Sequence, residues 1–155
     1  YLGICLGMQV AVMEYGRNVL GLKDANSREF DENGANLVID FMSDQVDLEE
    51  VGGTMRLGLY PCQIEKDSKL HELYGKDFIE ERHRHRLEFN NDYRERYLEG
   101  GMVLSGKSPD GRLVEAVELK DHKFFVAAQY HPEFLSRPNR PHPLFVGLVH
   151  ASKGE

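Results

Sequence analysis

Short apolar runs, separated by polar and glycine-containing stretches, repeat along the chain and predict a mixed α/β fold. Some of these runs carry apolar residues at helical spacing. In residues 6–15 these are Leu6, Val10 and Met13, which predict a buried helix that stops at Gly16. Three further helices are expected: one between the capping residue Ser68 and Gly75, one over residues 91–99 and one over residues 143–152.

Other apolar runs are short and rich in β-branched or aromatic residues, which is typical of strands. Turn residues at positions 108–111 and 121–122 join the last of these runs as hairpins, so the late part of the sheet is expected to be antiparallel. Residues 18–36 are rich in Gly, Asn, Asp and Glu and predict a long loop. Strands are expected at residues 37–42, 58–64, 102–107, 112–120 and 123–130.

One cysteine occupies a predicted sharp turn near the start of the chain. The heptapeptide Gly-Ile-Cys-Leu-Gly-Met-Gln at residues 3–9 follows an apolar stub and precedes a helix-forming run, so Cys5 is expected between a strand and a helix. Gly3 and Gly7 let the backbone bend without crowding the sulfur. The helix N-terminus behind the turn favours a thiolate. A lone cysteine is often only a small buried hydrophobe, but the strained elbow makes a nucleophile the better interpretation.

A second candidate group follows the apolar run that ends near residue 128. His131 and Glu133 are two positions apart and would leave extended backbone on the same side, while Pro132 disfavours helix there. A thiol nucleophile needs a base, and that base needs an acceptor for its other nitrogen. Cys5, His131 and Glu133 supply these three roles. Alone, a His-x-Glu pair would indicate no more than a strand end with a solvated glutamate.

The densest charge cluster contains three arginines and two histidines. If this segment is a strand, Arg82, Arg84 and Arg86 share one face, while His83 and His85 share the other. Neighbouring glutamates offset the basic charge, which argues against a nucleic-acid patch, and two histidines without an evident third ligand do not indicate zinc. We therefore expect a polar network beside a substrate pocket, and no metal site.

Composition narrows the class of protein. The chain has 155 residues, 41% of them hydrophobic and 29% charged, which fits one soluble domain with a sizeable core. The net charge of −7 argues against a nucleic-acid partner, and no apolar stretch is long enough for a signal or a membrane span. A disulfide between the two cysteines, Cys5 and Cys62, would consume the nucleophile, so both are expected to be reduced and the protein cytoplasmic.

Two motifs together carry a family resemblance. Residues 3–9, Gly-Ile-Cys-Leu-Gly-Met-Gln, and residues 129–133, Gln-Tyr-His-Pro-Glu, resemble the class I glutamine amidotransferases. Three further segments, at residues 25–30, 52–58 and 81–86, resemble the amidotransferase domain of the CTP synthase family and extend the similarity over most of the chain.

This resemblance implies a fold, a reaction and partners. The fold would be a flavodoxin-like sheet flanked by helices, in a single partial domain over residues 1–155 whose N-terminal strands, together with a preceding synthetase domain, are expected to be missing. Ammonia released from glutamine would pass to the synthetase domain, which would use ATP and Mg²⁺ to aminate UTP to CTP. GTP would activate the enzyme through the loop at residues 52–58, and the intact enzyme would be a homo-oligomer. No cofactor is expected in this chain.

The same resemblance implies roles for individual residues. Cys5 would attack the glutamine amide to give a γ-glutamyl thioester, His131 would manage the proton and Glu133 would fix the imidazole. The backbone N–H of Leu6 would be one oxyanion donor, and the family's second donor would lie upstream of Tyr1. The family's glutamine-binding positions match Leu6, Gly7, Met8, Gln9, Glu29 and Arg86, with Glu29 the natural partner of the substrate ammonium.

Two alternatives stay open beside this interpretation. The same triad could serve another class I amidotransferase or a γ-glutamyl hydrolase, or the chain could be a folded but inactive fragment. The remaining thiol is expected to be structural. The remaining histidines are expected at the surface or at helix ends; they are His71, His122, His142 and His150.

Overall fold

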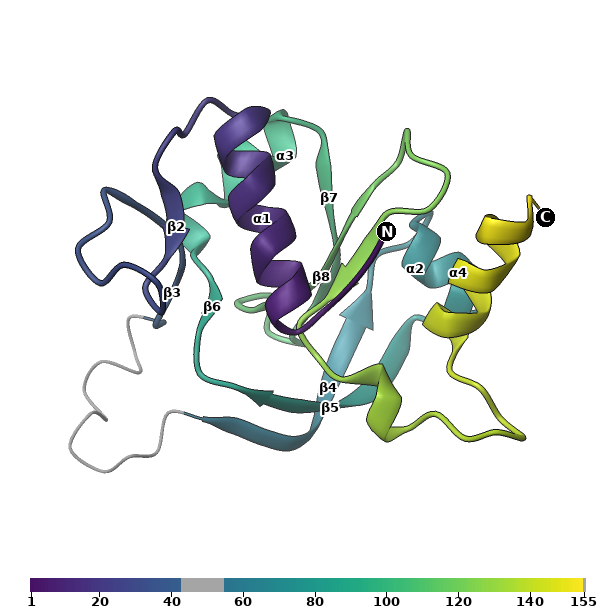
Figure 1. Cartoon of the computed structure of the whole chain (residues 1–155). Coiled ribbons are helices and arrows are strands. Elements are labelled where there is room, and N and C mark those ends of the chain that lie inside the picture. Colours follow the sequence, from purple (N-terminus) through teal and green to yellow (C-terminus); the bar gives the residue numbers. More distant parts are fainter. Residues whose placement is uncertain (43–54, 155) are drawn as a thin grey trace.

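Two β-sheets form the framework of the chain (Figure 1). The structure, a computed structural model, describes residues 1–42 and 55–154. In the larger sheet, β1 pairs with β9 in parallel, and the other neighbouring strands pair antiparallel. The strand order is β1 (Leu2–Ile4), β9 (Val126–Ala128), β8 (Val114–Leu119), β7 (Met102–Lys107), β4 (Arg56–Ile64) and β5 (Phe78–His85). The predicted α/β class is confirmed, and the antiparallel part extends beyond the late hairpins to β4 and β5.

The smaller sheet contains a strand that the sequence does not predict. It joins β2 (Ala25–Ser27), β3 (Asn36–Asp40) and β6 (Glu88–Phe89), with β2 parallel to β3 and β3 antiparallel to β6. The expectation of an uninterrupted loop over residues 18–36 is therefore wrong at β2. Ala25 and Ser27 are fully buried there, and pairing with β3 satisfies backbone groups that burial removes from water.

The helices lie close to their expected positions. Ser68 caps the second one, since its hydroxyl accepts a hydrogen bond from the His71 backbone N–H at 3.0 Å, and Gly75 ends it in the left-handed conformation. The α-helices are α1 (Leu6–Asn18), α2 (Lys69–Tyr74), α3 (Arg94–Glu99) and α4 (Pro143–Lys153), and two 3₁₀ turns are η2 (Asn91–Tyr93) and η3 (Pro132–Phe134).

Helix α1 differs from its prediction in length and in its buried face. It continues past Gly16 to Asn18, because this glycine serves close packing and not termination. A Cβ at Gly16 would lie 2.5 Å from the Tyr97 hydroxyl oxygen. The predicted buried stripe is correct at Met13 but wrong at Leu6 and Val10, which are each 45% exposed. The residues of α1 that are buried are Met8, Gln9, Ala11, Val12, Met13 and Gly16.

Two hydrophobic clusters hold the elements together. One joins α1 to both sheets and includes Met8, Phe89 and Tyr97. The other lies between the large sheet and the pair α2–α4, which pack against each other (Figure 1), and includes Cys62 and Tyr130. Over the described residues, no helix is both long and apolar enough to cross a membrane.

Candidate active site

Cys5 lies at the junction between β1 and α1, in a strained backbone conformation. Its φ of 51° and ψ of −105° fall where a non-glycine residue is rarely found, and it is the N-cap of α1. Gly3 is required by close approach, since a Cβ there would lie 2.8 Å from the Cβ of Ala127. A Cβ at Gly7 would make only an ordinary contact, 3.7 Å from the Tyr1 hydroxyl. The predicted elbow is confirmed, with Gly3 the glycine that its packing requires.

His131 and Glu133 meet directly beyond the end of β9. His131 Nδ1 lies 2.6 Å from Glu133 Oε1, and the backbone N–H of His131 donates to Arg82 O at 2.8 Å. The sequence suggested an extended segment here, but the backbone from Pro132 to Phe134 is a 3₁₀ turn. Pro132 begins the 3₁₀ turn η3, since a proline fits the first helical position, where its missing N–H is not needed. His131 Nε2 is buried and has no hydrogen-bond partner among the described residues.

Parallel pairing of β1 with β9 brings the two parts of the site to one edge of the sheet. Ile4 is in register with Ala128, and the Cys5 backbone N–H donates to Ala128 O at 2.8 Å. The next residue along, Gln129, donates from its side-chain Nε2 to the Cys5 sulfur at 3.7 Å. Glu133 is close enough to shift the pKa of Cys5 by its charge. The sulfur and the His131–Glu133 pair therefore share the carboxyl ends of neighbouring strands.

The Cys5 thiol is harder to ionise than the sequence suggested. Burial raises its pKa above the ordinary value, and the charges of Glu133 and Glu29 raise it further. Hydrogen bonds from the Leu6 backbone N–H and from the Gln129 side chain lower it, but they do not outweigh the loss of hydration. The first backbone N–H of the helix thus favours the thiolate, as expected, but burial outweighs its effect, so ionisation needs a base.

A cavity of about 560 Å³ opens beside the sulfur. Five of the residues expected in the site line it, from three separate segments: Cys5, Leu6 and Gln9 at the start of α1, Glu29 after β2, and Arg86 after β5. An anionic and a cationic side chain in one hollow suit a zwitterionic amino acid. Other charged residues line the cavity as well, among them Arg28, Glu32 and Arg84.

Two expected binding residues are used within the fold. The Met8 side chain is fully buried in the core, so it faces no cavity. The Gln9 side chain is 3% exposed, and its Nε2 donates to Leu87 O at 3.4 Å and to Gln129 Oε1 at 3.2 Å. The side-chain amide nitrogen of Gln9 thus has its hydrogen-bond partners inside the protein. Gln9 still lines the cavity, but this nitrogen is not free to bind a substrate.

The strand β5 separates its arginines from its histidines, as predicted. Arg82 and Arg84 are exposed, whereas His83 and His85 are buried. His85 Nδ1 contacts Leu87 O at 3.0 Å, so it carries the proton and leaves His85 Nε2 to accept from His83 Nδ1 at 2.9 Å. Burial, together with the positive charge of Arg56, lowers the pKa of His83 to about 2 and of His85 to about 3. Both rings are therefore neutral.

Sequence reasoning missed the buried ion pairs behind this strand. Arg56 binds Glu115 through two nitrogens, at 2.8 and 3.2 Å, and Glu88 through one at 3.1 Å. Burial raises the pKa of Glu88 to about 8, against the lowering effect of Arg56. The available signal was the glutamate at position 115, which alternates with apolar residues in a strand-like run.

A second buried network connects α4 to the sheet. His142, the N-cap of α4, is 4% exposed, and its Nε2 lies 2.8 Å from Glu81 Oε1. The hydroxyl of Tyr74 contacts Glu81 at 2.9 Å and Tyr130 at 3.1 Å. His142 was expected at the surface or a helix end, and it occupies a helix end that is buried.

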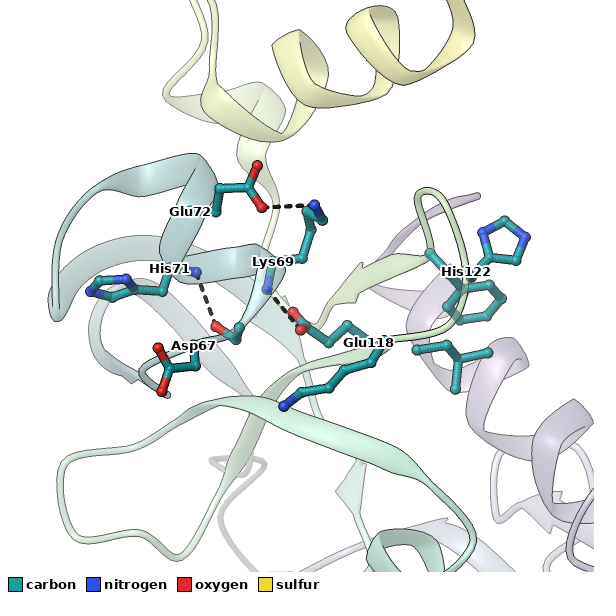
Figure 2. A pocket seen from close by; sticks show the side chains of 10 residues that line it. Asp67, Lys69, His71, Glu72, Glu118 and His122 are labelled. Atoms are coloured by element: carbon teal, nitrogen blue, oxygen red, sulfur yellow. Dashed lines mark hydrogen bonds and ion pairs between the residues drawn. The ribbon is translucent and has the colours of Figure 1, made fainter. Parts of the chain in front are cut away.

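Another cavity, of about 510 Å³, lies between the start of α2 and the β8–β9 turn (Figure 2). Its buried carboxylate, Glu118, accepts backbone N–H groups of Lys69 at 2.8 Å and of Leu70 at 3.1 Å. The Lys69 ammonium reaches Glu72 at 2.7 Å. The bonds of Glu118 tie α2 to the sheet, and none of the residues expected in the site lines this cavity.

Part of one predicted segment lies outside the described residues. The loop at residues 52–58 was expected to mediate activation by GTP; its positions 52–54 fall outside the described residues, while Met55 lines the cavity beside Cys5. Both cysteines are free thiols, Cys5 half-buried and Cys62 buried. Burial raises the pKa of Cys62 well above its ordinary value, which fits a structural thiol.

Comparison with known proteins places this site in a family. The family model described as "Glutamine amidotransferase class-I" matches residues 1–151. The chain belongs to the class I glutamine amidotransferases. A CTP synthase of Carboxydothermus hydrogenoformans is 62% identical to this amidotransferase over 152 residues, which cover 98% of this chain and 28% of that protein. A CTP synthase of Bacillus subtilis is 59% identical with the same coverage. The chain thus spans little more than a quarter of these relatives.

Solved structures agree with this assignment. The glutaminase domain of Trypanosoma brucei CTPS, solved with bound acivicin, matches with a TM-score of 0.93 at 39% identity, covering 100% of this amidotransferase chain and 60% of that one. A Thermoplasma acidophilum protein, described as a subunit of a GMP synthase, matches with a TM-score of 0.59 at 16% identity, covering 99% of this chain and 57% of that one, and shows the shared fold alone. The resemblance to the amidotransferase domain of CTP synthases is confirmed.

Proposed function

We propose that this chain is the glutamine-hydrolysing part of a CTP synthase and that it works through a Cys5–His131–Glu133 triad. One observation carries the proposal. A cysteine in a strained elbow shares a sheet edge with a hydrogen-bonded His–Glu pair, and its sulfur borders a cavity that holds both an anionic and a cationic side chain. The similarity to CTP synthases along nearly the whole chain supports the same assignment.

The proposed reaction begins with transfer of the Cys5 proton to His131. His131 Nε2 takes the thiol proton, and the sulfur then attacks the side-chain amide carbon of glutamine. The oxyanion accepts a hydrogen bond from the Leu6 backbone N–H. The imidazolium returns its proton to the leaving nitrogen, so ammonia departs and a γ-glutamyl thioester remains. Water, activated by His131, attacks this thioester, which releases glutamate and regenerates the thiol. Glu133 holds the Nδ1 proton throughout.

Charge decides how glutamine is oriented. We place the substrate ammonium at Glu29 and the substrate carboxylate at Arg86, because each then meets its opposite charge within one cavity. Gly7 and Met8 contribute through their backbone, since the Met8 side chain is buried in the core.

The remaining partners belong to the rest of such an enzyme. Ammonia would pass to a synthetase domain that aminates ATP-activated UTP, because protonation in bulk water would destroy its nucleophilicity. We place ATP and Mg²⁺ in that domain, activation by GTP at the loop over residues 52–58, and the whole enzyme in the cytoplasm as a homo-oligomer. The assignment of residues 1–155 to one partial domain stays a prediction. By itself this chain would turn over weakly or not at all, because one oxyanion donor is expected from another part of the domain.

The decisive experiment removes the sulfur. In the full-length protein, Cys5→Ala should lower glutamine hydrolysis at least about 1,000-fold, because Cys5 is the only thiol among the described residues that line the cavity. Cys62→Ala is the matched control and should retain the activity, since Cys62 is buried in the core. Acivicin, which the trypanosomal domain binds, should label Cys5 with a stoichiometry near one.

The outcomes separate the alternatives. Hydrolysis by Cys5→Ala at a rate near that of the unmutated protein excludes Cys5 as the nucleophile. Formation of CTP from UTP, ATP and glutamine identifies a CTP synthase, whereas glutamine hydrolysis that no UTP consumption accompanies indicates another amidotransferase or a γ-glutamyl hydrolase. Absence of both hydrolysis and labelling in the full-length protein contradicts the proposal.

A further inference from the structure

Gln129, the residue between β9 and the His131 segment, has its side chain aimed at the nucleophile. It is fully buried, and its backbone N–H donates to Glu115 O at 2.8 Å, which fixes the residue against β8. Its Nε2 donates to the Cys5 sulfur at 3.7 Å. No step of the proposed mechanism uses this amide.

A second amide fixes which way the Gln129 side chain points. Gln9 Nε2 donates to Gln129 Oε1 at 3.2 Å, so that oxygen is occupied and the nitrogen faces the sulfur. Gln9 is itself held by Leu87 O at 3.4 Å, and the same carbonyl contacts His85 Nδ1 at 3.0 Å. Rotating the Gln129 amide by half a turn would bring two N–H groups face to face at Gln9 and an oxygen against the sulfur.

We infer that Gln129 is a positioning residue that holds the Cys5 sulfur as an ionised nucleophile, and that Gln9 sets its orientation. The inference rests on the proposed function of Cys5. In the thiol form the S–H donates to Arg84 O, 3.9 Å away. Once the proton has left, that carbonyl repels the sulfur, while the Gln129 N–H attracts it more strongly than before. The amide thus acts on the charged form selectively.

The charges around Cys5 oppose its ionisation, so a hydrogen bond that favours the thiolate has a larger effect on its reactivity. Glu133 from η3 and Glu29 after β2 both oppose ionisation of the sulfur, as does burial. The other titratable groups that line the cavity are Arg28, Glu32, Arg84, His85 and Arg86, of which His85 is neutral. Among the described residues, the Gln129 amide and the Leu6 backbone N–H donate the hydrogen bonds that favour the thiolate.

The test measures the thiol directly, without glutamine. In the full-length protein, Gln129→Met keeps the size of the side chain and removes the donor. We expect the apparent pKa for alkylation of Cys5 by iodoacetamide to rise by about one unit, with an approximately tenfold slower reaction at pH 7 and an unchanged limiting rate at high pH. Gln9→Met should shift the profile in the same direction by a smaller amount, because it only releases the amide.

Two controls give each outcome a meaning. Gln63→Met makes the same substitution at an exposed position of strand β4 and should leave the profile unchanged. Circular dichroism identifies a variant that fails to fold, and Gln9→Met then carries the test. Superimposable profiles for a folded variant and the unmutated protein overturn the inference. A shifted profile in a protein that hydrolyses no glutamine would keep the role of Gln129 and reject the proposed function.

Discussion

At the scale of single residues, the Cys5 sulfur is held where ionisation is opposed. Burial and the carboxylates of Glu133 and Glu29 raise its pKa, and two hydrogen bonds reduce the rise only in part. A thiol in this environment is protonated at neutral pH, unlike one that a helix N-terminus alone activates. Reactivity at pH 7 therefore depends on a base, and the buried His131 Nε2, which has no partner among the described residues, suits that role.

The base can be removed while the thiol stays. In full-length His131→Ala, we expect iodoacetamide to alkylate Cys5 at least about tenfold more slowly at pH 7, with the rate rising only at alkaline pH, because burial raises the pKa of the thiol. His150→Ala, an exposed position on α4, is the control. A His131→Ala profile that coincides with the control would mean that the thiol ionises without this imidazole.

Some residues of the site could be predicted from the sequence, and others could not. Cys5 and His131 could be predicted because each lies in a short motif whose glycine or proline residues indicate a turn. The position of Gln129 against the sulfur depends on β1 pairing in register with β9, a contact between residues more than a hundred positions apart. The raised pKa of Cys5 has the same origin, because burial and facing carboxylates are products of the tertiary fold.

At the scale of elements, α1 packs against both sheets, and this packing buries a different face from the one that its apolar periodicity predicts. Leu6 and Val10 look like core residues in a periodic pattern, yet their exposure is 45% each, while the glutamine at position 9 is buried. Periodicity locates a helix but does not determine which face packs when two layers compete for it. The helix was predicted to end at Gly16 because a glycine near the end of a helical pattern is typical of a C-terminus, whereas this glycine is needed for close packing.

The close packing of α1 can be tested at Gly16. Alanine normally stabilises a helix relative to glycine by about 1 kcal/mol. At Gly16 the new methyl group would meet the Tyr97 hydroxyl oxygen at 2.5 Å and the Cβ of Ala25 at 2.9 Å. Because this hydroxyl also bonds Val12 O at 2.7 Å, it cannot move freely. We therefore expect Gly16→Ala to destabilise the protein by about 1–3 kcal/mol in urea unfolding.

A matched substitution lies in the same helix. Gly7→Ala adds a methyl group whose nearest contact is an ordinary 3.7 Å, so its folding free energy should be unchanged or slightly improved. If Gly16→Ala were as stable as Gly7→Ala, the inner surface of α1 would tolerate more volume than its contacts with Tyr97 and Ala25 permit.

At the scale of the whole molecule, a buried polar layer joins β4, β5, β6 and β8. Arg56 is the cation of this layer, and it lies against two glutamates and over the ring of Tyr60 at 4.6 Å. The two neutral histidines, His83 and His85, flank it on β5. These groups titrate differently in the folded and unfolded chains, so the layer makes stability depend on pH in both directions.

The directions of these shifts predict a maximum of stability near pH 6.5. Below pH 6.5 the unfolded chain protonates His83 and His85, whose folded pKa values are about 2 and 3, so stability falls with acid. Between pH 4.5 and 8 the folded chain keeps a proton on Glu88 that the unfolded chain releases. Stability from Glu88 is therefore lost as pH rises toward 8. The net slope is about 1.4 kcal/mol per pH unit on each side of the maximum.

One substitution isolates the alkaline side of this profile. Glu88→Gln keeps an acceptor for Arg56 and removes the titrating proton, so its unfolding free energy should stay level between pH 6.5 and 8, where that of the unmutated protein declines. Below pH 6 the variant should lose stability more steeply than the unmutated protein, because the histidines then act without the opposing effect of Glu88. Urea unfolding of the full-length protein at pH 5, 6.5 and 8 measures this. Parallel curves for the two proteins above pH 6.5 would show that Glu88 is already ionised in the fold, paired with Arg56 as a charge.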